Sequence, residues 1–354
     1  MREIKAALQK RSQLLLPLLS LCAIVIFNLI RDTGFFSVQL FTNNFGNRVL
    51  SGNLIFLLNN ASELAILSMG MTLVTAVSRG QDISVGAGAA IAGSIFVSVL
   101  LSNPITLATI LVAFIASCFV AMVFGAFNGI LVAVFKIQPM IATLILFTIG
   151  RSIAYWINGG ATPNVSSDLI NYIGNFIPGI PVPTPIFIVI ICALLFAVVL
   201  RLTNLGLYAQ AVGINEKAAR LNGIHTVGMK LLSFVILGIC VAFASIISVS
   251  RMGLINHETI LLGIEMDAIL AVAIGGNSLG GGKFSILGSV IGAYVIQGLT
   301  TTLLAMKVPS TDVKAYKAVV IIAIVVIGSP VIKKVAGQLC NRYLTTGKHL
   351  RREG

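Results

Sequence analysis

The chain has 354 residues, of which 57% are hydrophobic and only 10% are charged, and its mean hydropathy is +1.01. Soluble domains carry about a quarter charged residues, so a soluble fold of this composition would lack the polar surface that covers a core. The net charge of +13 lies in Lys and Arg at the ends of long apolar runs, which indicates membrane topology and argues against a nucleic-acid partner. We therefore predict an all-α polytopic membrane protein in contact with the lipid bilayer.

Ten apolar runs follow one another along the chain, most of them near the roughly 20 residues that cross a bilayer as a helix. They lie at about 12–30, 54–77, 83–101, 105–134, 137–157, 186–200, 231–250, 266–275, 286–305 and 318–332. The first run follows basic residues, as a signal peptide does, but it is longer and no A-x-A site follows it, so we predict an uncleaved span. The run at 266–275 is short and could re-enter the membrane instead of crossing it, leaving eight or nine spans.

Lys and Arg also predict the orientation, because they gather in cytoplasmic loops. With the N-terminus inside and ten crossings, the inside segments hold 17 of the 24 Lys and Arg residues and the outside segments hold 7. We expect a single transmembrane domain over residues 1–354, with about ten helices in two related halves and both termini in the cytoplasm.

Three connecting loops are long: 31–53 and 158–185 are expected outside, and 201–230 inside. Loop 158–185 contains Pro163, Pro178, Pro181, Pro183 and Pro185. Proline disfavours helix and sheet, so this loop is expected to stay extended. The outer loops could dock an external partner or be ordinary solvent-facing connections.

The inner loop contains a segment typical of a short helix between Gly213 and Gly223. Asn215 is a favourable N-cap, Glu216 suits the positive start of a helix, and Gly223 can take the left-handed conformation that ends it. Ala218 and Ala219 give the segment a small face. A helix of two turns is marginal alone in water, so it needs a docking surface within this chain or on a partner.

Two glycine-rich segments interrupt the apolar runs, one in each half, at 79–88 and 275–283. Their candidate functional residues are Gly80, Asp82, Ser84 and Gly86 in the first, and Gly275, Gly276, Asn277 and Ser278 in the second. Paired interruptions are typical of broken helices beside a solute path. Both could instead be tight cytoplasmic turns. The second segment lacks the first glycine and the Ser/Thr of a P-loop, so we expect no ATP hydrolysis by this chain.

Charged residues in or near spans are candidates for function, because a charge at the bilayer centre costs about 2.5–3.5 kcal/mol on insertion scales. These are Glu63, Asp82, Arg151, Glu265 and Asp267. Asn59 and Glu63 are i,i+4 neighbours, and their amide and carboxylate groups suit a hydroxyl-rich ligand. Glu63 could alternatively lie near the outer interface or pair with Arg151. Scattered Cys and His residues indicate no metal site, and we expect no catalytic site and no cofactor.

Four motifs in order along the chain resemble the membrane permease subunits of ribose/xylose/galactose-type ABC sugar importers. They are 70–74 leading to 82–86, Asn128-Gly129 followed by 137–144, the inner segment 213–223, and 265–269 followed by 275–282. Arg79 and Gln81 depart from the pattern, since the family usually has glycine and an apolar residue there.

The resemblance implies a subunit of the bacterial cytoplasmic (inner) membrane that works beside a second permease subunit, identical or homologous. A cytoplasmic ATP-binding subunit and an extracytoplasmic sugar-binding protein complete the system. Coupling to the ATPase is assigned to Gly213, Glu216, Ala218, Ala219 and Gly223. The solute path or gate is assigned to Glu63, Gly80, Asp82, Ser84, Gly86, Asn128, Gly275, Gly276, Asn277 and Ser278.

The predicted function is therefore translocation of a monosaccharide or sugar-like solute by an ATP-driven importer. We expect Ala219→Asp to abolish transport by burying an unpaired charge at the ATPase contact. The alternatives are the same architecture with a non-sugar solute, an ion-coupled secondary transporter that uses its intramembrane carboxylates, and a membrane scaffold that does not transport. A channel is disfavoured, because the sequence shows no filter-like segment.

Overall fold

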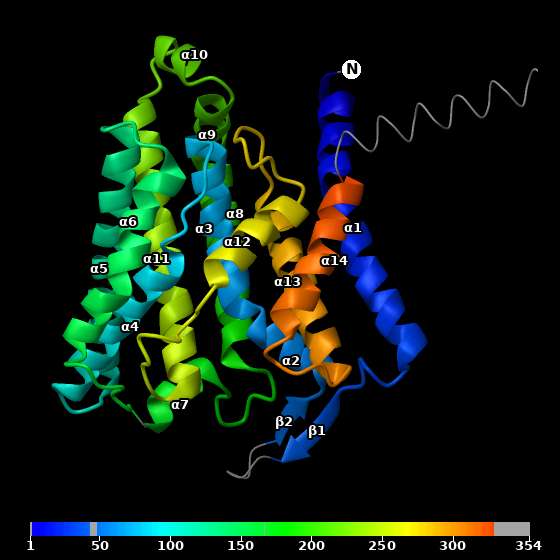
Figure 1. The fold of residues 1–354 in the computed structure, drawn as a ribbon, viewed down its shortest axis with the longest axis vertical. Coiled ribbons are helices and arrows are strands. Elements are labelled where there is room, and N and C mark those ends of the chain that lie inside the picture. The colour runs from blue at the N-terminus through cyan, green and yellow to red at the C-terminus, as the bar shows by residue number, and fades with distance from the viewer. Residues whose placement is uncertain (1, 43–47, 166, 329–354) are drawn as a thin grey trace, which may run out of the picture. The chain divides into compact units, whose positions relative to one another are not determined.

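The computed structural model describes residues 2–42, 48–165 and 167–328, which are almost entirely helical (Figure 1). The elements are α1 (Arg2–Arg31), β1 (Gln39–Thr42), β2 (Arg48–Ser51), α2 (Asn53–Asn60), α3 (Ser62–Ser78), α4 (Val85–Leu101), α5 (Leu107–Ala133), α6 (Pro139–Ile157), α7 (Asp168–Gly174), α8 (Thr184–Leu202), α9 (Leu205–Ile214), α10 (Glu216–Leu221), α11 (Thr226–Met252), α12 (Ile264–Ile274), α13 (Ile286–Ala305) and α14 (Val313–Gly328). The chain divides at Thr301 into two compact units, and the second contributes α14 and the end of α13.

Each predicted apolar run contains a helix, which confirms the all-α polytopic architecture. Within the described residues, 7 helical segments are long and apolar enough to cross a membrane: α1, α2 with α3, α5, α6, α8, α11 and α13. Helices α4 and α12 are shorter, with 17 and 11 residues. The number of crossings and the side of each terminus stay predictions, and part of the last predicted run, 329–332, lies outside the described residues.

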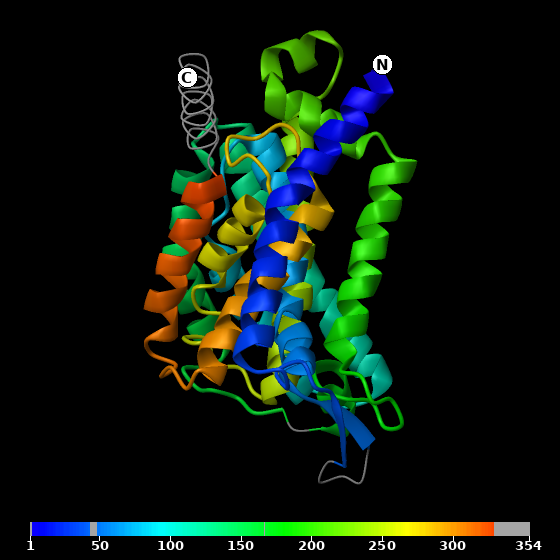
Figure 2. The ribbon, with the colours of Figure 1, turned by 90° about the vertical axis from the view of Figure 1, so that its right-hand side faces the viewer.

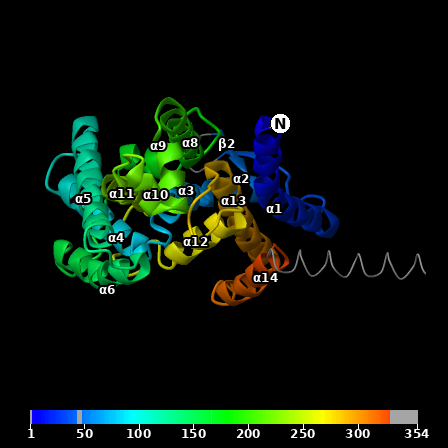
Figure 3. The same ribbon diagram turned by 90° about the horizontal axis from the view of Figure 1, so that it is seen from above.

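Helix α3 is the centre of the first unit. It packs against α11, α12, α8 and α9, and Figure 3 shows it among these helices. In the most apolar 18-residue stretch of each span, 94% of the residues are buried in the span of α2 and α3, against 17% in α8 and 22% in α5. The outer helices therefore offer apolar faces suited to lipid, while α3 is enclosed by protein.

The loops of this unit gather at two opposite ends (Figures 1 and 2). The α10 end carries α9 and α10, and the hairpin end carries β1, β2 and α7. At the hairpin end, the Leu50 N–H donates to Pro181 O over 2.9 Å, which joins the two loops predicted to lie outside. This separation of the loops is consistent with the prediction that successive loops lie on alternate sides of the membrane.

One feature of the outer loops was not predicted, and one expectation for them was wrong. Loop 31–53 contains an antiparallel hairpin, in which Gln39 pairs with Ser51 and Thr42 with Arg48. Loop 158–185 is not extended throughout, since it contains α7. The prolines flank α7 instead of lying within it, and Pro183 and Pro185 form the start of α8, where a missing N–H costs nothing.

Two helices begin after stretches of non-helical backbone. Residues 79–84 lead from α3 into α4, and residues 253–263 lead from α11 into α12. Figure 1 shows that α4 and α12 start partway along the bundle. Both stretches therefore bring irregular backbone among the helices, which a membrane protein tolerates only where protein or water satisfies its polar groups.

Candidate functional site

The first glycine-rich segment is buried, unlike a tight turn facing solvent. Gly80, Gln81, Asp82 and Ser84 are all buried and none is helical. Gly80 packs directly against the Pro139 ring at the start of α6. The structure thus favours the broken-helix interpretation of this segment over the turn.

A compact hydrogen-bond network holds the segment in place. The Asp82 Oδ1 atom accepts from the Ser84 N–H over 2.7 Å and from the Ser84 hydroxyl over 2.6 Å. The Asn128 amide on α5 donates to Asp82 Oδ2 over 3.2 Å and to Ser84 Oγ over 2.8 Å. Three residues that the sequence assigned to the solute path are therefore brought together, and they fix the start of α4 against α5.

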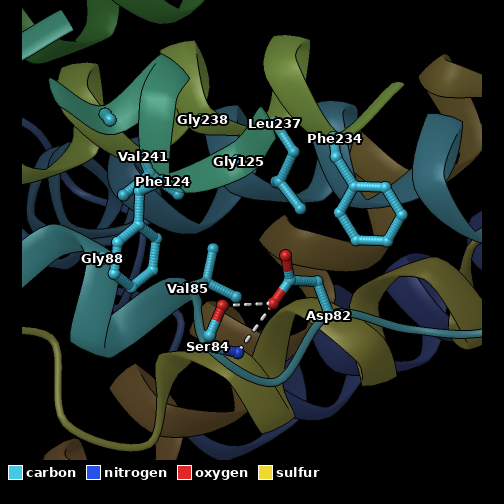
Figure 4. A pocket seen from close by; sticks show the side chains of 11 residues that line it. Asp82, Ser84, Val85, Gly88, Phe124, Gly125, Phe234, Leu237, Gly238 and Val241 are labelled. Carbon is cyan, nitrogen blue, oxygen red and sulfur yellow. Dashed lines mark hydrogen bonds between the residues drawn. The ribbon is translucent and has the colours of Figure 1, made fainter. Parts of the chain in front are cut away.

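A small pocket adjoins this network between α4, α5 and α11 (Figure 4). Asp82 and Ser84 form its polar wall, and side chains such as Phe124, Phe234 and Leu237 form the apolar remainder. Figure 4 shows the Asp82 carboxylate bonded to Ser84. Both carboxylate oxygens of Asp82 accept hydrogen bonds from this chain, so Asp82 holds the backbone at the start of α4 in place.

Gly86, on the first turn of α4, lies where the first and fourth motifs meet. A methyl group in its place would lie 2.6 Å from Glu265 Oε2 on α12 and 3.2 Å from the Arg151 guanidinium on α6. Arg151 also donates to the carbonyls of His257 and Ile260, over 2.7 and 3.1 Å. A side chain from α6 thus satisfies the irregular backbone that leads into α12.

The second glycine-rich segment does not join the Asp82 network through its predicted residues. Asn277 Oδ1 accepts from the Ser285 N–H over 2.6 Å, and the Asn277 amide donates to Ser289 Oγ over 2.7 Å. Gly275 packs against the backbone of α13. Gly276 has a φ of 78°, and Ser278 is exposed and accepts from the Gly280 N–H over 3.2 Å. Asn277 and Gly275 therefore form the α12–α13 turn.

Glu63 forms an ion pair at the hairpin end, and its partner differs from the one considered from the sequence. Its carboxylate lies 2.8 Å from Arg251 Nη1 at the end of α11, so pairing with Arg151 was wrong. Arg251 also donates to Asn60 Oδ1 over 3.1 Å and to Asn59 O over 3.0 Å. The cluster joins the junction of α2 and α3 to α11, and Glu63 is only 4% exposed.

The inner segment has the predicted helix. The Asn215 side chain accepts from the Ala218 N–H over 3.1 Å, which confirms the N-cap of α10. Gly223 has a φ of 79°, which confirms the left-handed residue after the helix. The Glu216 carboxylate lies 2.8 Å from Lys230 Nζ, which ties α10 to α11. Gly213 lies at the end of α9, against the backbone of Ala76 and Gly282.

The two alanines of α10 point in different directions. Ala219 is 4% exposed and packs into a core cluster of this chain. Its neighbours there are Leu73, Val77, Ala209 and Val212. Ala218 is exposed, and Leu221 is 90% exposed at the end of the helix. An Asp at position 219 would therefore be buried inside this chain itself, so Ala219→Asp does not isolate a contact with a partner.

Several contacts of the site were not predicted. Arg251 lies far from Glu63 in the sequence, and only the packing of α3 on α11 brings them together. Thr72 on α3 donates to Ser289 Oγ on α13 over 2.6 Å, a buried polar contact between apolar runs. A polar residue in an otherwise apolar run is the signal that could have singled out Thr72 and Ser289.

A family model described as "branched-chain amino acid transport system / permease component" matches residues 53–328. The galactofuranose transporter permease of Escherichia coli (strain K12) is 39% identical over 280 residues, which cover 79% of this chain and 80% of the relative. The fructose import permease of Bifidobacterium longum (strain NCC 2705) is 34% identical, covering 82% and 81%. The ribose import permease of E. coli (strain K12) is 36% identical, covering 78% and 85%.

No solved structure matches the chain. The family model covers every element of the site, from the Asn59–Glu63 junction to the α12–α13 turn. The chain therefore belongs to the family of membrane permease components that this model describes.

Proposed function

We propose that this chain is the permease subunit of an ATP-binding-cassette importer that carries a monosaccharide or sugar-like solute across the bacterial cytoplasmic membrane. The observation that carries the proposal is the similarity, over about four-fifths of both chains, to a permease named for galactofuranose transport. Two further relatives are named for fructose and ribose import. The chain is a transport subunit, and ATP hydrolysis is assigned to a separate chain.

The partners follow from the two ends of the first unit. At the α10 end, the exposed side chains of Ala218 and Leu221 offer a contact for a cytoplasmic ATPase subunit. At the hairpin end, the joined outer loops offer a contact for a sugar-loaded binding protein. A second permease subunit, identical or homologous, completes the pore. Glu216 and Gly213 support α10 from within, and Gly223 ends it.

For the solute path, the structure supports the first glycine-rich segment more strongly than the second. Asp82, Ser84 and Asn128 hold its buried backbone, and Gly80 and Gly86 let that backbone lie close to α6 and α12. Gly275, Gly276, Asn277 and Ser278 shape the α12–α13 turn. Glu63 joins α3 to α11 at the hairpin end through its ion pair with Arg251.

A non-sugar solute on the same architecture is the second candidate, because the family model is described by branched-chain amino acid transport.

Purification of the tagged chain in mild detergent, followed by an ATPase assay, tests the main proposal. We expect an ATPase subunit to co-purify and a binding protein loaded with D-ribose, D-fructose or galactofuranose to stimulate it. Transport by the chain alone on an H⁺ or Na⁺ gradient would instead establish the ion-coupled alternative.

Leu221→Asp is expected to weaken attachment of the ATPase subunit by at least about tenfold, because it places a charge at the exposed apolar end of α10 and desolvates it in the contact. The measurement is the ATPase activity recovered with the tagged permease. Asn204→Asp is the matched control, since it adds the same charge in the same loop at the exposed N-cap of α9, where Asp is favourable. Equal recovery of ATPase with both variants would contradict the assignment of this contact to α10.

A further inference from the structure

Arg79 begins the first glycine-rich segment and joins it to the α9–α10 junction. It follows α3 directly and has a φ of 58°, which is a left-handed backbone conformation. Its Nε atom donates to Gly213 O over 2.7 Å, and its Nη2 atom donates to Ile214 O over 2.6 Å. These are the last two carbonyls of α9, so a cation satisfies the negative end of this helix just before Asn215 begins α10.

The second glycine-rich segment meets Arg79 at the same place. The Gly282 N–H donates to Ala76 O, on the last turn of α3, over 3.0 Å. A methyl group at Gly281 would lie 2.7 Å from Arg79 Cγ, and one at Gly213 would collide with Ala76 O. The ends of α3 and α9 therefore pack backbone to backbone with this turn. Because these backbones are in direct contact, a displacement of one of them is passed to the others.

Gln81 adds a second link between the two glycine-rich segments, because its amide donates to Leu279 O over 3.0 Å. Asp82 follows at once, and its bonds to Ser84 and Asn128 fix the start of α4. A continuous set of contacts thus runs from the end of α9, which leads directly into α10, through Arg79 to the buried segment beside the pocket. Arg79 and Gln81 are also the two positions at which the sequence departs from the pattern of the family it resembles.

We propose that Arg79 is a positioning residue for energy coupling, which makes a displacement of α9 and α10 move both glycine-rich segments together. This rests on the proposed function, since it takes α10 as the contact for the ATPase subunit. Within the part of the chain that the structure describes, the Arg79 side chain donates to carbonyl oxygens, so its effect on solute is exerted through the backbone of residues 80–84 and 279–282.

The test uses the complete importer, with its ATPase subunit and binding protein, in proteoliposomes. Sugar uptake and ATP hydrolysis are measured in the same vesicles, with whichever of D-ribose, D-fructose and galactofuranose stimulates the wild type. For Arg79→Gln we expect the ATPase subunit to stay bound and the sugar taken up per ATP to fall at least about fivefold. Arg79→Lys keeps the charge and can still donate to the carbonyls, so it should recover at least half of the loss.

Lys136→Gln is the matched control, because Lys136 is also an exposed basic residue with a left-handed φ, of 57°, in a loop predicted to lie on the same side. Unchanged uptake per ATP in Arg79→Gln, an equal loss in Arg79→Lys, or a proportional fall of uptake and hydrolysis would each overturn the proposal. If Arg79→Gln does not reach the membrane, Gln81→Met is measured instead. A fall in the sugar taken up per ATP by Gln81→Met would support the proposal, and an unchanged ratio would overturn it. Absence of an ATPase subunit from the wild-type preparation would instead refute the proposed function.

Discussion

An Arg251→Met variant is expected to lose about 3–5 kcal/mol of stability, because it leaves the buried Glu63 carboxylate without its cation. The same change removes the donors that Asn59 and Asn60 accept from, so the junction of α2 and α3 separates from α11. The measurement is the midpoint of thermal unfolding in detergent, followed by size-exclusion chromatography with fluorescence detection. Sugar uptake should fall together with the stability, because the junction of α2 and α3 is no longer held against α11.

The double variant Glu63→Gln/Arg251→Met should regain much of the lost stability, since it buries neither charge unpaired. Arg48→Met is the matched control at an exposed position of strand β2 and should stay within about 0.5 kcal/mol of the wild type. A double variant less stable than both single variants would show that the cluster is held by more than this ion pair. If Arg251→Met were as stable as the wild type, the ion pair between Glu63 and Arg251 would not contribute to the stability of the protein.

Asp82→Leu should abolish uptake and destabilise the fold, because it removes the acceptor of the Ser84 N–H and hydroxyl and one of the two acceptors of the Asn128 amide. Each buried group left without an acceptor costs about 1–3 kcal/mol. Asp82→Asn should keep most of the stability and part of the uptake, because its carbonyl oxygen can still accept from Ser84. The measurements are thermal unfolding in detergent and uptake in proteoliposomes by each variant.

Asn128→Asp supplies the comparison for this network. It places two carboxylates side by side at the present distance of 3.2 Å and should be more destabilising than Asp82→Asn. The exchange variant Asp82→Asn/Asn128→Asp restores one carboxylate and one amide and should regain part of the loss. If Asp82→Asn abolished uptake without loss of stability, the charge of Asp82 would act on the solute and our structural assignment would be wrong.

The parts of the fold that could be predicted are those that depend on local sequence. Long apolar runs predict helices because an isolated span must satisfy its own backbone. The caps of α10 could be predicted because Asn215 and Gly223 act within one turn of their own positions. The same local rules predicted that residues 79–84 interrupt a helix, but left open whether they form a turn.

The parts that could not be predicted depend on which helices become neighbours. Glu63 meets Arg251 and not Arg151 because α3 packs along α11, which no local pattern encodes. Arg79 reaches Gly213 across 134 positions of sequence for the same reason. The hairpin was missed because its strands are only four residues each, too short for a clear alternation of apolar and polar side chains.

The enclosure of α3 has a consequence for the biogenesis of the chain. This helix enters the membrane early, yet the helix that contacts it most extensively, α11, is synthesised more than 140 residues later. Until then Glu63 has no Arg251, and the face of α3 that packs on α11 lacks this partner helix. We expect nascent chains that end before α11 to be held by insertion factors or degraded, and the assembled core to become resistant to proteases only when α11 is complete.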